Sequence, residues 1–333
     1  MNENLQPGWN GMMEIDPSED VTLERRDLFR GAGTVAAWLA AAGTSAQAVP
    51  ADEKVPEAKA GPPLPLAPFG RHKISRLIAG ANPIYGYSHF NYVFSAHMGE
   101  YHTTQRVLSF LHELERAGLR TWQASWSERL ETDWLKYKEQ GGKLDLLLLS
   151  RPTFNDQPEM LERAAKLKPL GIAQHGASTN RFWDAGQFDR SLDYLKRIRD
   201  TGFLVGLSCH NPLEVEYAEE KGWDVDYYMT SLYYMNRPRA EFEKILGQVP
   251  LGEIYLPSDP PKMLAAIRKA KKPCLVYKVL AAGRTVNSPQ QVKERMTVAL
   301  KGIKPNDALI IGMYQRFNDQ IGQTAAFLRE LLA

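Results

Sequence analysis

Two cysteines in 333 residues are too few for the disulfide framework that is typical of small secreted proteins. Cys209 and Cys274 both fall in predicted strands, where a small core side chain is a commoner role than a ligand or a nucleophile. The charge imbalance is also small, with 41 basic and 39 acidic side chains and a formal net charge of +2. Surfaces that bind nucleic acid are strongly basic, so nucleic acid is not expected as a partner.

Long hydrophobic runs are missing as well. The most apolar stretch near the N-terminus, residues 31–43, is too short and too rich in Ala and Gly to span a bilayer, so we expect no stable membrane anchor. A glycine-rich phosphate turn is absent after the first predicted strand. That strand is followed by Gly80-Ala81-Asn82-Pro83, in which Pro83 removes an amide donor that such a turn would need. This absence argues against a doubly wound dinucleotide-binding sheet.

The N-terminal segment has the pattern of an export signal. Glu24-Arg25-Arg26-Asp27-Leu28-Phe29-Arg30 is a twin-arginine pattern, and Ala46-Gln47-Ala48 follows the weakly apolar run as a cleavage site. An ordinary amphipathic helix is the alternative interpretation. We predict a signal peptide over residues 1–48, the Tat translocase as a partner during export, and a periplasmic or extracellular location. Residues 49–68, rich in Pro, Ala and Lys, predict a disordered linker.

Residues 69–333 predict one (β/α)₈ barrel, because apolar strands alternate with amphipathic helices and no second domain is indicated. A long loop is expected over residues 81–101, and a longer excursion over residues 232–257 carries a short helix around residues 242–246. The strands are predicted at residues 74–80, 119–123, 144–150, 171–175, 203–210, 225–231, 273–280 and 308–312. The helices are predicted at residues 103–117, 128–139, 158–167, 188–200, 212–221, 260–271, 290–300 and 319–332.

The carboxyl ends of barrel strands usually hold the chemistry, and three of them here end in a titratable side chain. His175 and His210 each close an apolar run, where a histidine can act as a general acid or base near neutral pH. Lys278 ends the seventh predicted strand and could bind a substrate oxygen or, if desolvated, form a Schiff base. The alternatives are satisfied histidines packed near the rim and a lysine paired with a carboxylate. We predict that these three catalytic candidates converge in one pocket.

Other polar and aromatic residues follow the strands or lie in the first loop, and they predict binding of a small-molecule substrate, with carbohydrate suggested by the aromatic rings. A metal site would use the histidines at positions 89, 97, 102, 175 and 210. No metal is predicted, because no strand end supplies an Asp or Glu and no H-x-H or H-E-x-x-H pair occurs. The substrate-binding candidates are Asn82, Tyr87, His89, Gln123, Trp126 and Arg151.

Three segments in order and spacing resemble the aldo/keto reductase superfamily: residues 69–80, residues 205–210 and residues 276–284. Ile310-Ile311-Gly312 is similar to that family's last-strand cofactor turn. The resemblance implies a (β/α)₈ barrel and an NADP cofactor, held by Ser208, Tyr233, Gly312 and Arg316.

Of the four catalytic residues of that family, this chain matches only the histidine, at His175. Gln123 stands at the position of its aspartate, Glu128 where its tyrosine is expected, and Arg151 follows the third strand in place of its lysine. Arginine cannot titrate as an acid, so ordinary carbonyl reduction lacks its usual proton donor.

Three functions are therefore compatible with the sequence. The first is an oxidoreductase that acts on a sugar- or polyol-like substrate and exports its nicotinamide cofactor tightly bound. The second is a non-redox lyase, isomerase or hydrolase that uses His175 and His210 as acid and base, with Lys278 holding a substrate oxygen. The third is a catalytically inactive barrel that binds carbohydrate through its first loop. The fifth-, seventh- and eighth-strand segments, which resemble the cofactor-binding segments of the aldo/keto reductases, favour the first over the others.

Overall fold

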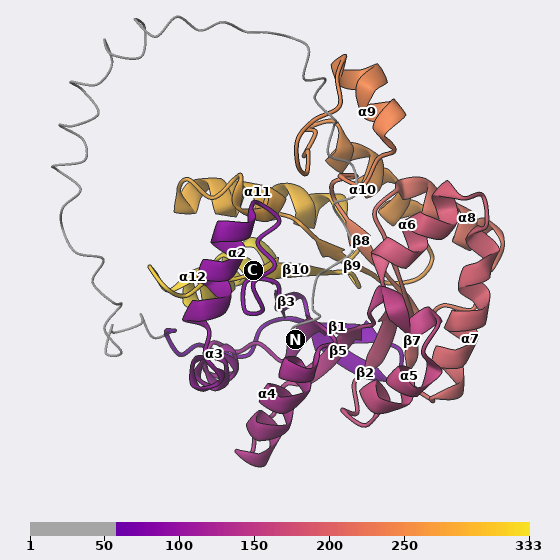
Figure 1. Cartoon of the computed structure of the whole chain (residues 1–333). Coiled ribbons are helices and arrows are strands. Elements are labelled where there is room, and N and C mark those ends of the chain that lie inside the picture. Colours follow the sequence, from indigo (N-terminus) through magenta and orange to yellow (C-terminus); the bar gives the residue numbers. More distant parts are fainter. Residues whose placement is uncertain (1–57) are drawn as a thin grey trace, which may run out of the picture. The chain divides into compact units, whose positions relative to one another are not determined.

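Eight parallel strands close into a barrel in residues 58–333, the part of the chain that this computed structural model describes (Figure 1). The order around the barrel is β10-β3-β4-β5-β6-β7-β8-β9, so each strand pairs with its neighbours in sequence and the last pairs with the first. The predicted (β/α)₈ fold is confirmed. The strands are β3 (Leu77–Gly80), β4 (Thr121–Ser125), β5 (Asp145–Leu149), β6 (Gly171–Gln174), β7 (Leu204–Cys209), β8 (Tyr227–Ser231), β9 (Cys274–Tyr277) and β10 (Ala308–Gly312).

Helices surround the strands (Figure 1). Most lie within a few residues of their predicted positions, and the helix from Glu128 to Glu139 has the predicted bounds. The helices are α2 (Tyr92–Tyr101), α3 (Thr104–Arg116), α4 (Glu128–Glu139), α5 (Pro158–Ala165), α6 (Gly176–Asp184), α7 (Ser191–Asp200), α8 (Pro212–Glu220), α9 (Arg239–Leu246), α10 (Asp259–Lys269), α11 (Pro289–Gly302) and α12 (Gln320–Leu332).

The barrel interior and the layer beneath the helices form two separate apolar clusters. In β5, Leu147 belongs to the interior cluster, whereas Leu146 and Leu148 pack outward under the helices. Successive strand residues point to opposite faces, and here both faces are buried, which explains the unbroken apolar run in the sequence. The interior cluster also contains Ile78, Ala173, Tyr227, Met229, Leu275, Ala308 and Ile310.

An antiparallel hairpin closes the end of the barrel at which the strands begin. Its strands β1 (Leu66–Phe69) and β2 (His72–Ser75) place Phe69 and Ile74 in the interior cluster. The prediction of one strand over residues 74–80 is therefore wrong. The chain breaks at Arg76, whose backbone amide donates to Pro65 and whose guanidinium donates to the carbonyls of Asp307 and Lys304.

The predicted linker also extends too far. From residue 58 onward the chain is ordered on the barrel, because Gly61 and Leu64 donate backbone hydrogen bonds to the carbonyls of Arg116 and Gly118, and Leu64 is buried. The barrel domain thus begins before residue 69. The predicted signal peptide and the first part of the linker lie outside the described residues.

Two helices were not predicted. α2 occupies the second half of the expected loop at residues 81–101, and α6 begins directly after His175. α2 exposes Tyr92 and Val93 at its start and buries only Met98 and Tyr101 in its second half, so it lacks an apolar stripe. α6 begins Gly176-Ala177-Ser178-Thr179-Asn180, a run with weak helix propensity.

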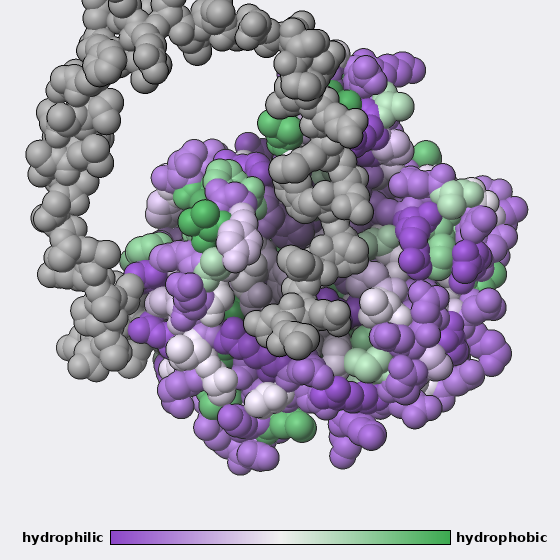
Figure 2. All heavy atoms as spheres, viewed as in Figure 1, coloured by the Kyte–Doolittle hydropathy of each residue, from purple (hydrophilic) through white to green (hydrophobic). Residues whose placement is uncertain are grey.

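The visible face of the molecule is largely hydrophilic, with hydrophobic side chains scattered among polar ones (Figure 2). Scattered exposed apolar side chains are normal for a folded domain and do not by themselves mark a binding surface. Among the described helices, none is both long enough and apolar enough to cross a membrane.

Candidate active site at the carboxyl ends of the strands

His175 follows β6 and caps the N-terminus of α6. Its Nδ1 accepts a hydrogen bond from the backbone amide of Ala177 at 3.1 Å. An accepting Nδ1 cannot carry a proton, so the neutral ring holds its proton on Nε2 and presents an N–H donor. Burial, followed by the charges of Arg151 and Lys278, lowers the pKa of His175 to about 4. His175 is therefore a neutral donor at physiological pH.

His210 follows the neighbouring strand β7 and has the opposite tautomer. Its Nδ1 lies 3.0 Å from Oδ1 of Asn180 on α6, and because an amide oxygen only accepts, Nδ1 donates and Nε2 keeps its lone pair. The side chain is 9% exposed. Burial, with smaller contributions from Lys278, His175 and His89, holds the pKa of His210 well below its usual value.

The backbone of His210 is fixed by the start of α8. The Glu214 carboxylate accepts hydrogen bonds from the amides of His210 at 2.9 Å and Asn211 at 3.1 Å, and Asn211 caps the helix in return. This capping box, in which Pro212 occupies the first turn, matches the predicted start of the helix. Burial raises the pKa of Glu214 to about 8.

Gly176 allows the His210 ring to approach the start of α6. A Cβ atom at position 176 would lie 2.4 Å from Cε1 and 2.8 Å from Nδ1 of His210. Neither distance is possible for a real side chain, so the orientation of His210 depends on the absence of a side chain here.

Lys278 lies directly after β9 in a left-handed backbone conformation, with φ at +60°. This region is unfavourable for a side chain that is neither Gly, Asn nor Asp, and such strain concentrates at functional positions. His89, in the first loop, is strained in the same way, with φ at +55°. Burial lowers the pKa of Lys278 to about 8, which Glu253 opposes and Arg284 assists.

We expect Lys278→Met to stabilise the fold at neutral pH. Each pKa unit corresponds to about 1.4 kcal/mol, so a fall from 10.5 to about 8 costs the native state about 3 to 4 kcal/mol well below pH 8. The unfolded chain binds more protons between pH 8 and 10.5, so wild-type stability should rise with pH there and the advantage of the variant should shrink. Urea denaturation at several pH values measures this, with the exposed Lys269→Met as the control. Equal stability of wild type and Lys278→Met at pH 7 would contradict it.

The carboxylate of the site comes from a loop, Glu253, and not from a strand end. Glu253, between α9 and α10, accepts from Nδ1 of His89 at 2.8 Å and from the Tyr255 hydroxyl at 3.0 Å. Burial favours the neutral acid, but the hydrogen bond from His89 and the charges of His89 and Lys278 outweigh it and lower the pKa of Glu253. Glu253 is therefore a negative charge that acts on Lys278 and opposes the fall of its pKa.

Arg284 ties the three loops around this cluster together. Its guanidinium donates to the backbone carbonyls of His89 at 3.2 Å, Glu253 at 3.3 Å and Ala281 at 3.3 Å, and it lies 4.2 Å from the centre of the Tyr255 ring. Planar stacking with several donor bonds is the arrangement that arginine, rather than lysine, can make. Arg284 thus holds the first loop against the loops that follow α9 and β9.

Of the six predicted substrate-binding residues, three belong to the cluster around His175 and Lys278, and three lie in other surroundings. Asn82 bonds the His89 Nε2 atom at 3.1 Å, and Arg151 is close enough to His175 to lower its pKa, so these two and His89 belong to the cluster. Tyr87 is 42% exposed in the first loop, and Gln123 is a buried residue of β4. Trp126 is buried between the Phe154 ring and the Arg163 guanidinium. A role in substrate binding stays a prediction for all six.

The four residues predicted to hold NADP contact four different parts of the chain. Buried Ser208 bonds the Tyr277 hydroxyl at 3.2 Å, and the buried Tyr233 ring lies 5.2 Å from the ring of Tyr255. Pro83 packs on Gly312, so that a Cβ atom there would lie 2.9 Å from its ring. Arg316 donates to His97 on α2. These four contacts are separate from one another, and binding of NADP by these residues stays a prediction.

No group of three or more His, Cys, Asp or Glu side chains in residues 58–333 is arranged to hold a metal ion. His97 and His102, two of the histidines that a metal site would use, lie on and just after α2, where His102 bonds the Met98 carbonyl.

Cys209 and Cys274 are free and buried, and burial raises the pKa of both thiols. Neutral buried thiols behave as core residues, as the sequence predicts.

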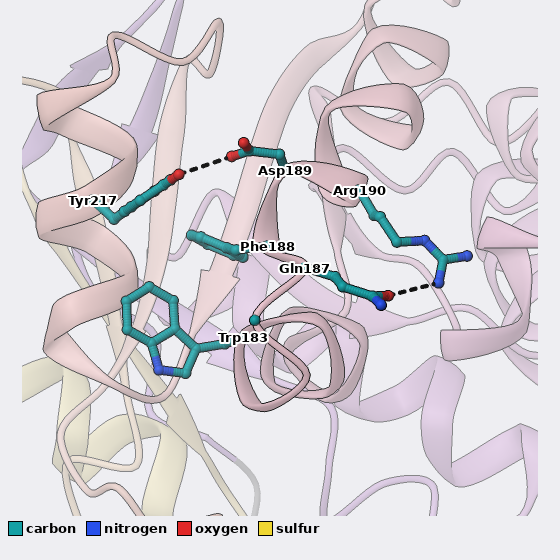
Figure 3. Close-up of a pocket in the computed structure, with 7 residues that line it drawn as sticks. Trp183, Gln187, Phe188, Asp189, Arg190 and Tyr217 are labelled. Atoms are coloured by element: carbon teal, nitrogen blue, oxygen red, sulfur yellow. Dashed lines mark hydrogen bonds between the residues drawn. The ribbon is translucent and has the colours of Figure 1, made fainter.

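Two cavities differ in whether a predicted catalytic residue lines them. One of about 370 Å³ is lined by His210 and Asn211, together with Ser231, Tyr234 and the buried Arg237–Asp259 ion pair. A second, of about 610 Å³, lies between α6, α8 and the segment joining α6 to α7 (Figure 3). Its polar side chains are already paired, since Tyr217 donates to Asp189 and Arg190 donates to Gln187 (Figure 3). Only the first cavity reaches a predicted catalytic residue.

Comparison with known proteins gives similarity of fold only. The glycerol dehydrogenase AKR11B4 from Gluconobacter oxydans aligns over 80% of this chain and 95% of its own, at 12% identity and a TM-score of 0.50. A truncated 3-deoxy-D-arabino-heptulosonate 7-phosphate synthase from Thermotoga maritima aligns over 81% and 91%, at 13% identity and a TM-score of 0.47. With the glycerol dehydrogenase the chain shares the barrel fold. No protein-family profile matches the sequence, and no curated protein matches it.

This likeness includes an aldo/keto reductase, in line with the resemblance seen in the sequence, but barrels of this kind carry unrelated chemistries. The function has to be argued from the site. Sequence reasoning missed Glu253, Arg284 and Asn180, which lie in loops or in the unpredicted α6. Gly252-Glu253-Ile254-Tyr255 gave no periodic signal, so nothing local marked its carboxylate.

Proposed function

We propose that this protein is a non-redox enzyme that moves a proton at a carbon next to a carbonyl group in a short, sugar-like hydroxyaldehyde or hydroxyketone. Such proton transfer is the step shared by isomerases and lyases that act on these compounds. The non-redox alternative is thereby preferred to an oxidoreductase that holds NADP. A further expectation, export to the periplasm, is independent of this chemistry and stays a prediction.

One observation carries the proposal: two neutral histidines follow adjacent parallel strands with opposite tautomers. His175 offers an Nε2–H donor, and His210 keeps an Nε2 lone pair. A donor polarises a carbonyl oxygen, and an acceptor removes a proton, so the pair supplies both halves of an enolisation. Each tautomer is set by its own local partner, Ala177 for His175 and Asn180 for His210, and together they supply the donor and the acceptor that the proposed reaction needs.

The preference for non-redox chemistry rests on contacts within the chain. Tyr233 packs against Tyr255, and Pro83 packs against one side of Gly312, at two of the positions where the resemblance would place the cofactor. The cluster around Lys278, by contrast, is polar and bears complementary charges. The sequence departs from the aldo/keto reductases at the tyrosine and lysine that protonate the carbonyl, which supports the same choice.

The proposed substrate class is based on the charges of the cluster and on the volume of the cavity that His210 lines. Arg151 and Lys278 give the cluster two cationic groups near His175, which suits a substrate with an anionic or strongly polar oxygen. The cavity of about 370 Å³, which His210 lines but His175, Arg151 and Lys278 do not, is within the size range of small-ligand sites. Short hydroxyketones, with or without a phosphate ester, meet both conditions.

Solvent-deuterium exchange tests the proposal directly. Dihydroxyacetone and dihydroxyacetone phosphate are incubated with the protein in D₂O, and NMR follows the loss of the proton next to the carbonyl. We expect exchange with wild type and with the control His72→Gln, on the hairpin at the other end of the barrel, and none above background with the His175→Gln/His210→Gln double variant. Exchange that is equal in all three proteins, or absent from wild type, would overturn the proposal. Oxidation or reduction that needs added NADP would favour the redox function instead.

A further inference from the structure

We propose that Lys278 forms a covalent imine with the carbonyl carbon of the substrate. The inference rests on the proposed function, because it names how the same site makes a substrate carbon acidic. It assigns to Lys278 a nucleophilic role rather than the binding of an oxygen. The argument uses the backbone, the partners and the charges around this one side chain.

The backbone holds Lys278 in place at a cost. Its left-handed conformation is followed within four residues by two more, at Ala281 and Ala282, with φ at +49° and +50°. Only five residues other than glycine have positive φ in the described chain, and four of them, Lys278, His89, Ala281 and Ala282, lie in or next to the cluster. Strain of this kind persists only where the surroundings impose it. The turn after β9 is therefore built to present a defined side chain.

The amine of Lys278 is not neutralised by a partner. Within residues 58–333 it makes no hydrogen bond and no salt bridge, and its nearest aromatic contact is the Tyr277 ring at 6.0 Å. Glu253, the carboxylate that affects its titration, is engaged by His89 and Tyr255 instead. A lysine retained for structure at such a position would be expected to pair with that carboxylate.

The electrostatic surroundings favour the unprotonated amine, which is the nucleophile. Burial and the neighbouring Arg284 both disfavour the ammonium, and the pKa of Lys278 falls to about 8. Desolvation beside a second cation is the usual way in which a protein activates a lysine toward carbonyl compounds. An exposed lysine at neutral pH has a free-amine fraction smaller by about two orders of magnitude, given its unperturbed pKa near 10.4.

The histidines give a second reason to infer an imine at Lys278. His210 is held neutral by burial, so it is a weak base and would remove a proton only slowly from an ordinary hydroxyketone. A protonated imine draws electrons more strongly than a carbonyl and makes the adjacent C–H bond more acidic. The weak base and the activated amine are therefore complementary parts of one mechanism.

The steps balance without an oxidant or reductant. The Nζ lone pair attacks the carbonyl carbon while the C=O π pair moves to oxygen, whose charge is stabilised by the His175 Nε2–H. His210 transfers a proton from the new C–N nitrogen to that oxygen. A proton from solvent, equal to the one that Lys278 released on forming the free amine, then allows the oxygen to leave as water. The net change is ammonium plus ketone to protonated imine plus water.

Reductive trapping tests the inference. The folded full-length protein is incubated at neutral pH with dihydroxyacetone phosphate and sodium cyanoborohydride, which reduces imines, and the labelled lysines are located by peptide mass mapping. We expect Lys278 to be labelled at least about tenfold faster than the exposed Lys196 and Lys269, because its free-amine fraction is larger. Lys278→Arg should lose this label, whereas Lys269→Arg should keep it. Since trapping is also read in wild type, the result does not depend on how any variant folds.

The outcomes separate the inference from the function on which it rests. Labelling spread over surface lysines, with Lys278 unmodified or no faster than the others, overturns the imine. If deuterium exchange still requires the two histidines in that case, the acid–base function stands with Lys278 as a binding residue. Fast labelling of Lys278 without any histidine-dependent exchange would keep the imine and overturn the proton transfer.

Discussion

His210→Gln should lower the rate of deuterium exchange by about a hundred- to ten-thousandfold, the usual contribution of a positioned general base. Glutamine preserves much of the volume and can still bond Asn180, but it has no lone pair basic enough to take a proton from carbon. The fold should survive, because the backbone amide of His210 keeps its bond to Glu214. Exchange rates with dihydroxyacetone phosphate, beside circular dichroism of both proteins, measure this.

His175 should respond to the same substitution differently, since its proposed role is to donate. Glutamine at position 175 retains an N–H donor and should cost about tenfold or less in exchange, whereas His175→Leu, which has none, should cost about a hundredfold or more. His72→Gln should change nothing. If both histidines tolerated glutamine equally, the assignment of donor and base would be wrong.

Gly176→Ala is expected to damage both stability and activity, although the residue itself has no functional group. The new methyl group would lie 2.4 Å from Cε1 of His210, so the ring or the start of α6 must move. Overpacking of this kind costs about 1 to 3 kcal/mol of folding free energy, and displacement of the base should lower exchange about a hundredfold. Urea denaturation and the exchange assay measure the two effects separately.

A double variant shows whether the clash is the cause. His210→Ala removes the ring that the methyl group meets, so Gly176→Ala should destabilise the His210→Ala protein much less than the wild type. Exchange should stay low in the double variant because the base is gone. Gly99→Ala is the matched control, since a Cβ atom there meets nothing within 4 Å. Additive losses of stability in the double variant would contradict this account of Gly176.

The sequence predicted the barrel well because each strand has its own apolar run and most helices have their own amphipathic period. The predictions were wrong where contacts between distant residues, rather than the local sequence pattern, determine the structure. Residues 74–80 are mostly apolar, yet the chain turns at Arg76, whose side chain bonds carbonyls more than 200 residues away. α2 lacks an amphipathic stripe, and α6 begins with weak helix formers whose first turn is capped by a histidine.

The residues of the candidate site were predictable only where they directly follow a strand. His175, His210 and Lys278 end apolar runs, and in the structure each is close enough to the others to affect a pKa in the group. Glu253 and Arg284 could not be found in this way, because their positions depend on loops that meet only after folding. The tautomers of the histidines were equally hidden, since Ala177 and Asn180 that fix them belong to a helix without a sequence signal.

Nitrogen-15 NMR of the seven histidine rings tests the central claim most directly, with His175→Gln and His210→Gln used to assign the two signals. The account predicts that both rings remain neutral at about pH 5.5, below the usual histidine pKa, with the proton of His175 on Nε2 and that of His210 on Nδ1. Two rings that become protonated near pH 6.5, or that carry their proton on the same nitrogen, would contradict a paired donor and base at this barrel mouth.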